Sequence, residues 1–309
     1  MSHDMSHDAP SRSLAESVEG TSRQNFGLTD WGQLAATALV FGSAFLWIAL
    51  ALRSLSPGIV GFGRVALGGA TVALIPAARC AVAKRDWSRF ALAALFGQAG
   101  PALLFALAEQ RIPSAVAGML IAGVPIATAI VTAFFTRTLP SPTRVAGLAI
   151  GLVGIFLLTL PSLTSLGAET VGVLMVIVAV AAYAVAANLF APLQQTYGAL
   201  PTNMWLLIIS SVMLLPFGIA GLSDSSFEWL PVVALLILGI IGTGIVWTLF
   251  VAIIGRVGAV RAAIVGYMVP IVALLLGVLV LDESVEPIQV VGVVVALLGG
   301  YLVSRFRSQ

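Results

Sequence analysis

Residues 125–157 read PIATAIVTAFFTRTLPSPTRVAGLAIGLVGIFL, and residues 270–302 read PIVALLLGVLVLDESVEPIQVVGVVVALLGGYL. The two stretches align without a gap at an offset of 145, which pairs Pro125 with Pro270, Pro142 with Pro287, Gly147 with Gly292 and Gly154 with Gly299. Their loops differ in charge, because the first copy carries Arg137 and Arg144 whereas the second carries Asp282, Glu283 and Glu286. Opposite charge in equivalent loops is expected when two copies cross a bilayer in opposite directions. The pattern therefore predicts an inverted repeat.

The composition is that of an integral membrane protein. Hydrophobic residues make up 60% of the chain and charged residues 9%, and the mean hydropathy is +1.08, far above the averages of soluble proteins. The apolar segments approach the roughly 20 residues that a helix needs to cross a bilayer. They lack the alternating pattern of an outer-membrane β-barrel. We predict ten membrane-spanning helices, at 33–52, 57–78, 89–109, 113–136, 143–160, 171–193, 201–221, 230–252, 259–281 and 287–304.

These spans define an all-α integral membrane fold of two inverted five-helix repeats. The first repeat is predicted to cover 31–161 and the second 171–305. The polar segment 1–30 lacks the apolar region and cleavage motif of a signal peptide, and is predicted to be a disordered cytoplasmic tail. The two histidines of this tail and the single cysteine, Cys80, provide no metal-ligand spacing, so we expect neither a metal nor a cofactor.

Lysine and arginine side chains predict the orientation of the spans. Ten spans place both termini on one side, and that side receives the basic loop 79–89 and most of the other cations. The opposite side receives mainly acids, among them Glu109, Glu228 and Asp282. We therefore predict cytoplasmic termini in a bacterial inner (cytoplasmic) membrane. The cations are dispersed among short loops, so the expected partners are the lipid bilayer and a small-molecule substrate, and no nucleic acid.

The paired prolines lie inside the fourth and ninth spans. Each ring removes an amide donor and frees the carbonyl four residues earlier, at Ile121 for Pro125 and at Gly266 for Pro270. Such breaks are tolerated where the helix is covered by protein or lines a wet cavity. A kink that serves packing alone is the alternative. The symmetry of the pair favours two hinges.

Short motifs occur in both halves of the sequence. They are Phe41-Gly42-Ser43-Ala44-Phe45, Ser56-Pro57 followed by Gly63-Arg64, Gly258-Ala259, and Asp282-Glu283. Together with the paired prolines and glycines, this layout resembles the EamA family of the drug/metabolite transporter superfamily over all ten spans. The sequence departs from that family at Thr136-Arg137-Thr138, which replaces an acidic loop after the fourth span.

The resemblance implies a ten-helix secondary transporter, in which a central cavity between the two halves carries small metabolites by alternating access. The implied substrates are most often amino acids or related compounds moved outward. The alternative is a carrier of another metabolite class: a sugar phosphate, a nucleotide sugar, an amine or a drug.

Polar and aromatic side chains deep inside the spans are the candidates for lining that cavity, because unpartnered polar groups avoid hydrocarbon. Ser43 and Trp47, Thr128 and Thr132, and Thr243 and Trp247 form pairs four residues apart, each expected to share a helix face. Hydrogen bonds to the residue's own helix, or ring contacts with lipid, are the alternative for each. The remaining mid-span candidates are Gln98, Tyr183 and Tyr267; Tyr183 is favoured over Asn188, which lies on a different face.

Arg64 is the one formal charge well inside a span, about 10 Å from its nearer end by helical rise. An intramembrane charge is a functional candidate by default, and Arg64 could hold a substrate carboxylate. The alternatives are that its side chain extends toward the interface or pairs with Glu109.

The sequence also bears on energy coupling, on other classes of function and on the oligomeric state. No Asp or Glu lies deep within a span, which favours facilitated flux but leaves proton coupling through Glu109 or a tyrosine open. The chain lacks a phosphate-binding loop, and it also lacks the acid, histidine and nucleophile clusters that an intramembrane enzyme needs. A non-enzyme is therefore expected, and a scaffold without flux is disfavoured by the polar candidates. Small residues in the fifth and tenth spans could pack within a monomer or form a homodimer.

Overall fold

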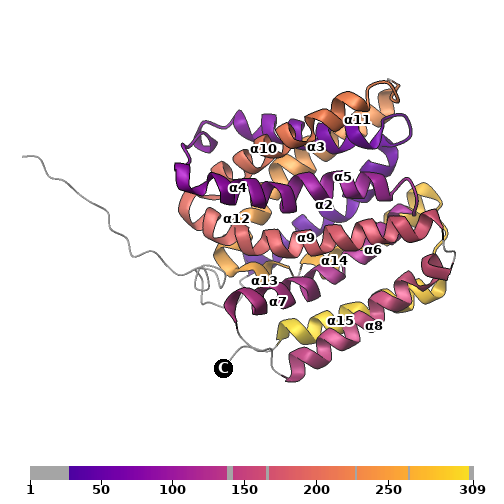
Figure 1. The fold of residues 1–309 in the computed structure, drawn as a ribbon. Coiled ribbons are helices and arrows are strands. Elements are labelled where there is room, and N and C mark those ends of the chain that lie inside the picture. Colours follow the sequence, from indigo (N-terminus) through magenta and orange to yellow (C-terminus); the bar gives the residue numbers. More distant parts are fainter. Residues whose placement is uncertain (1–27, 138–141, 165–166, 227, 264, 306–309) are drawn as a thin grey trace, which may run out of the picture.

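The computed structural model describes residues 28–137, 142–164, 167–226, 228–263 and 265–305, which form helices and loops with no strand among them (Figure 1). Most of the predicted tail, 1–27, lies outside the described residues, as does the loop 138–141. Helix α2 begins at Leu28, inside the segment predicted to be a tail.

Within these described ranges, seven helical stretches are long and apolar enough to cross a membrane. They are Trp31–Ala51, Lys84–Ala108, Ser114–Thr136, Glu169–Tyr197, Ala199–Ala220, Trp229–Val257 and Ala259–Leu281. Three further helices lie at the other predicted spans: α3 (Pro57–Ala73), α8 (Pro142–Thr164) and α15 (Pro287–Arg305). Helix α3 is shorter than the predicted span 57–78, and a separate 3-10 turn, η1 (Pro76–Ala78), follows it. Proline disfavours helical geometry in the residue before it, which explains the early end of α3.

Several spans contain a break. The third consists of α4 (Trp87–Ala94), the π-helical segment η3 (Leu95–Ala99) and α5 (Gly100–Ala108). The eighth consists of α11 (Trp229–Ile237), the π-helical segment η4 (Leu238–Val246) and α12 (Trp247–Val257). The fourth is divided into α6 (Ser114–Leu120) and α7 (Gly123–Thr136), and the ninth into α13 (Ala259–Ala262) and α14 (Val265–Leu281). The spans α2 (Leu28–Ala51), α9 (Ala168–Tyr197) and α10 (Ala199–Ala220) are each a single helix.

The offset of 145 that aligns the sequence also relates local backbone features. It maps η3 onto the interior of η4. It also maps Arg137, at the end of α7, onto Asp282, at the end of α14. These two have left-handed φ angles of 53° and 54°, and they are the only non-glycine residues with positive φ in the described part of the chain. Such a residue commonly ends a helix, so the fourth and ninth spans end in the same way.

Helices α8 and α15 lie side by side at the lower edge of Figure 1. Small residues make this contact, because a Cβ added at Gly154 would clash with the backbone of Ala296, and one added at Gly299 would clash with the backbone of Gly151. The predicted small-residue positions therefore pack two helices within the chain. Large apolar side chains such as Phe156 on α8 and Leu298 on α15 remain exposed, as expected for a surface in lipid.

Candidate functional site

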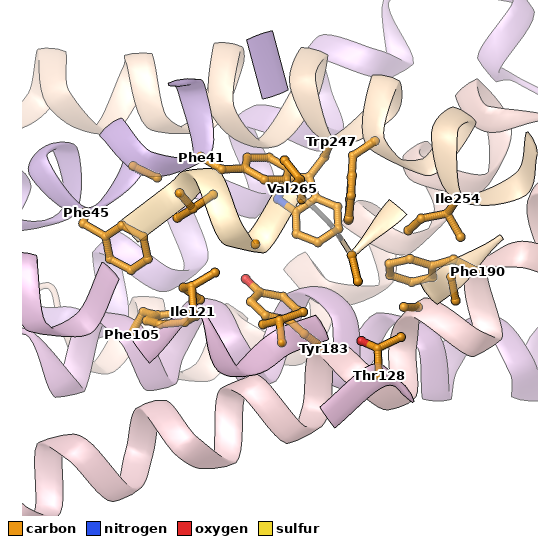
Figure 2. Close-up of a pocket in the computed structure, with 18 of the residues that line it drawn as sticks. Phe41, Phe45, Phe105, Ile121, Thr128, Tyr183, Phe190, Trp247, Ile254 and Val265 are labelled. Carbon is orange, nitrogen blue, oxygen red and sulfur yellow. The ribbon is translucent and has the colours of Figure 1, made fainter. Parts of the chain in front are cut away.

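A cavity lies at the centre of the bundle, bordered by α2, α3, α5, α7, α9, α12, α13, α14 and the α6–α7 break (Figure 2). Its volume is about 90 Å³. This is below the roughly 150 Å³ of an engineered apolar cavity that takes up benzene. A metabolite larger than a few water molecules can enter only if the side chains around the cavity move apart.

Aromatic rings form most of the cavity wall. Trp247 lies at the centre of this group, with ring centroids 5.2 Å from Phe41, 5.5 Å from Phe250, 5.7 Å from Tyr183 and 6.1 Å from Phe190. Phe105 continues the wall, 6.0 Å from Tyr183 and 5.5 Å from Phe45. These separations are typical of favourable ring pairs. Figure 2 shows the labelled rings around a common space, with the Tyr183 hydroxyl pointing into it.

Arg64 supplies the positive charge of this cavity. Arg64 is only 6% exposed, and it lines the cavity from α3. Its Nε donates a hydrogen bond to Thr243 Oγ1 at 3.3 Å. Neither ion pair found among the described residues involves Arg64, although Glu109 lies within electrostatic range. The expected alternatives, an exposed side chain or an ion pair with Glu109, therefore do not describe this structure.

Thr128, Tyr183 and Trp247 are the other predicted residues that line the cavity. Thr128 is completely buried, and its hydroxyl has no hydrogen-bond partner among the described residues. Thr128 belongs to the first half of the chain, whereas Tyr183 and Trp247 belong to the second. The cavity is therefore built from both halves.

The remaining predicted residues do not line the cavity. Ser43 donates to the carbonyl of Val40 in its own helix, and Thr132 donates to Asn188 Oδ1 at 2.8 Å. Trp47 packs against the hydrophobic core. Gln98 Nε2 and the Tyr267 hydroxyl are buried elsewhere without a hydrogen-bond partner in the described structure.

Thr243 and Trp247 have different surroundings, against the expectation that they share a helix face. Thr243 contacts Gly68 and Arg64 of α3, whereas Trp247 lines the cavity. Thr243 lies in the π-helical segment η4, and its hydroxyl donates to the carbonyl of Leu238, five residues earlier. Because a π-helix is wound with i→i+5 bonds, the four-residue face of an α-helix does not apply there.

The fourth and ninth spans contact each other beside the cavity. Ile121 and Gly266, whose carbonyls the two prolines were expected to free, both line it. A Cβ added at Gly266 would lie 3.1 Å from Pro125 Cδ and 3.3 Å from the Ile121 carbonyl oxygen. The first turn of α14 therefore packs directly against the break between α6 and α7.

Helices α6 and α14 contact each other next to Phe45 of the cavity wall. A Cβ added at Gly118 would clash with Ala273 and lie 3.1 Å from a ring carbon of Phe45. Farther along, the carboxylate of Glu283 accepts hydrogen bonds from the backbone N–H groups of Ser114 at 2.7 Å and Ala115 at 2.8 Å. We call this pair of bonds the Glu283 cap. It joins the loop after α14 to the first turn of α6.

The sequence did not single out the Glu283 cap or the phenylalanines of the cavity wall. Phe41 and Phe45 gave a usable signal, because they are four residues apart in a motif of the first span. Phe105, Phe190 and Phe250 gave none that separates a cavity wall from ordinary core.

Comparison with known proteins decides the family. The model of the EamA-like transporter family matches residues 31–160 and again residues 170–305. The chain belongs to the EamA-like transporter family. The resemblance inferred from the sequence is thereby confirmed, and the protein is a transmembrane transporter.

Relatives of this EamA-family transporter have been named in three prokaryotes. An uncharacterized transporter of Archaeoglobus fulgidus is 26% identical over 90% of this chain and 99% of its own length. The uncharacterized transporter YoaV of Bacillus subtilis is 22% identical over 82% of this chain and 88% of its own. A probable amino-acid metabolite efflux pump of Escherichia coli is 24% identical over 65% and 71%. A solved structure described only as the crystal structure of a protein aligns with 87% of this transporter and 94% of its own chain, with a TM-score of 0.60 at 17% identity. The two proteins share a fold.

Proposed function

We propose that this EamA-family transporter exports amino acids or related compounds across the cytoplasmic membrane, by alternating access through the central cavity. The observation that carries the proposal is the cavity itself, which lies where the two proline-containing spans meet, the first turn of α14 packing against the break between α6 and α7. Discontinuous helices at a repeat interface are the usual site of substrate binding in secondary transporters. The name of the Escherichia coli relative supports amino acids as the substrate class.

The architecture that we propose has ten spans in two inverted repeats, 31–161 and 171–305, with both termini in the cytoplasm. The shared offset of the π-helical segments and of Arg137 with Asp282 supports the repeat. The basic character of the loops on one side supports the orientation. In this arrangement the Glu283 cap lies at the extracellular end of the cavity.

Transport then proceeds by motion of the α6–α7 and α13–α14 spans against the rest of the bundle. Breaking the Glu283 cap and separating Gly118 from Ala273 would open the cavity to the outside. Pro125 and Pro270 act as hinges, because each permits its span to bend without losing a further backbone hydrogen bond. The predicted site residues that line the cavity, Arg64, Thr128, Tyr183 and Trp247, contact the substrate.

Flux in proteoliposomes tests this proposal. Purified protein is reconstituted, loaded with a panel of amino acids, amines, sugars and nucleotide sugars, and assayed for efflux with and without a pH gradient. Protein-free liposomes are the control. Efflux of amino acids or related acids above that control supports the proposal, and stimulation by an opposing proton gradient assigns proton coupling. Efflux confined to sugars or nucleotide sugars would contradict it.

A further inference from the structure

The charge balance of the cavity points to a substrate with a negative group. Arg64 is the only charged side chain among the described residues that line it. A buried charge without an ion-pair partner is unfavourable, and Glu109, although within electrostatic range, forms no such pair. A carboxylate bound to the guanidinium would neutralise the charge and accept two parallel hydrogen bonds.

A hydrogen bond to Thr243 holds this arginine in place. Thr243 donates its own proton to the Leu238 carbonyl at 2.9 Å, so its oxygen is left as an acceptor for Arg64 Nε. The hydrogen bond fixes one edge of the guanidinium toward η4. The two terminal nitrogens remain available, since no hydrogen bond within the described structure uses them. Thr243 is thus a positioning residue for Arg64.

The walls of the cavity favour a flat apolar body. Trp247, Tyr183 and Phe105 present ring faces and edges, and aliphatic side chains such as Val269 complete the lining. Apart from Arg64, the polar side-chain groups are the hydroxyls of Thr128 and Tyr183 and the indole N–H of Trp247. A sugar or nucleotide sugar would leave most of its hydroxyl groups without partners there, at a cost for each.

An ammonium group finds no counter-charge in the cavity. No Asp or Glu is among its described lining residues. An aromatic cage alone can bind a cation, but here Arg64 opposes one. The hydroxyls of Thr128 and Tyr183 can accept a hydrogen bond from an amino group, so the cavity tolerates an α-amino group without requiring it.

We propose that the cavity recognises arylalkyl carboxylates. Arg64 binds the carboxylate, the aromatic wall around Trp247 binds the ring, and an ammonium group on the substrate contributes little to the affinity. The inference rests on the proposed export function and specifies its substrate class. It predicts that amino acids are accepted as aromatic carboxylates rather than as zwitterions.

Three probes that share a phenyl ring test the proposal: 3-phenylpropionate carries only the carboxylate, phenylalanine carries both groups, and phenethylamine carries only the ammonium. Binding to purified protein is measured by tryptophan fluorescence or thermal shift, and flux by exchange in proteoliposomes. We expect the first two probes to bind within about threefold of each other and phenethylamine at least about tenfold more weakly, a difference of one decade in Kd. Equal or tighter binding of phenethylamine would overturn the proposal, and so would a strict requirement for the ammonium group.

Variants locate the recognition at Arg64. Arg64→Gln should weaken binding of both carboxylates about tenfold, and Arg64→Lys should restore part of it. Arg53→Gln is the matched control, because Arg53 is exposed and lies outside the cavity. Unchanged carboxylate affinity in a folded Arg64→Gln protein would overturn the proposal. If that variant does not fold, the comparison of the three probes on the native protein still tests whether the cavity recognises the carboxylate.

The two proposals fail in different ways. Binding of the carboxylate probes without any flux would refute the proposed export function but support the recognition of arylalkyl carboxylates. Efflux of other metabolites, with no binding of the carboxylate probes, would support transport but refute the recognition of arylalkyl carboxylates. Neither binding nor flux of any compound would overturn both.

Discussion

Glu283 Oε1 accepts a hydrogen bond of 2.7 Å from the backbone N–H of Ser114, a residue 169 positions earlier in the chain. The bond joins the second half of the molecule to the first at one end of the cavity. The offset of 145 maps Glu283 onto Thr138, which has no carboxylate. The halves are therefore chemically unequal: one helix start has an acidic cap from the opposite half, and its counterpart in the sequence lacks that acid. Under the proposed orientation, this asymmetry favours closure of the extracellular end.

Glu283→Gln should open that end more often. The amide keeps the size of the side chain but removes its charge and one of its two acceptor oxygens. Hydrogen bonds to charged groups contribute about 1.5–3 kcal/mol each. We expect Ala44→Cys in the cavity, in a Cys80→Ser background, to be labelled faster by an external impermeant maleimide. Asp282→Asn is the control, since Asp282 is exposed and forms no cap. An identical labelling rate in Glu283→Gln and Asp282→Asn would refute a gating role.

Gly118→Ala should destabilise the contact between α6 and α14, because the added Cβ meets Ala273. Overpacking of this kind costs about 1–3 kcal/mol. Adding Ala273→Gly removes the opposing methyl group and should recover much of the loss. The measurement is thermal unfolding of the purified single and double variants. Gly32→Ala serves as the neutral control, since a Cβ there has no neighbour within 4 Å. Additive losses in the double variant would show that the two helices are not in contact.

Thr128→Val separates binding from stability. The Thr128 hydroxyl is buried without a partner, which costs the folded state about 1–3 kcal/mol. Its removal should leave the unfolding temperature unchanged or raise it, whereas the apparent affinity for the transported substrate should fall. Thr159→Val is the comparison: that hydroxyl donates to the Ile155 carbonyl and lies outside the cavity, so it should leave affinity unchanged. A lower unfolding temperature with normal affinity for Thr128→Val would place this residue in the packing alone.

Pro125→Ala and Pro270→Ala should each slow transport more than they lower membrane abundance. Alanine restores the amide donor and straightens the span, so the bending that exposes the cavity becomes harder. We expect a loss of roughly tenfold in rate, equivalent to about 1.4 kcal/mol in the barrier. Pro287→Ala at the start of α15 is the control, because proline is well tolerated at a first helical position. Parallel losses of rate and abundance would argue against hinges.

The helical membrane fold could be predicted because a helix in lipid needs a long apolar segment, and because the loops on the two sides of the membrane differ in charge. The break just before Pro125 was visible too, since proline changes the backbone around it. The break of the ninth span was not, because it lies between Ala262 and Val265, and α14 continues as a helix through Pro270. The π-helical winding around Thr243 was not visible. It depends on packing against α3, and it moved Thr243 away from the face of Trp247.

The candidate site was only partly predictable. Arg64, Thr128, Tyr183 and Trp247 stood out as polar or large side chains deep in apolar spans, and all four line the cavity. Thr132 looked equivalent to Thr128, but it is paired with Asn188 from another span. Phe105, Phe190 and Phe250 gave no signal because an apolar wall and an apolar core have the same composition. The Glu283 cap joins residues far apart in the chain, so only the folded structure reveals it.

Accessibility labelling tests the central claim most directly, which is that two inverted halves enclose the cavity. Thr138→Cys and Ser284→Cys, each in a Cys80→Ser background, are treated in intact cells with an impermeant maleimide and then with a permeant one. The account predicts that residue 284 reacts with the impermeant reagent and residue 138 only with the permeant one. Labelling of both positions from the same side would contradict the inverted repeat and the transport mechanism built on it.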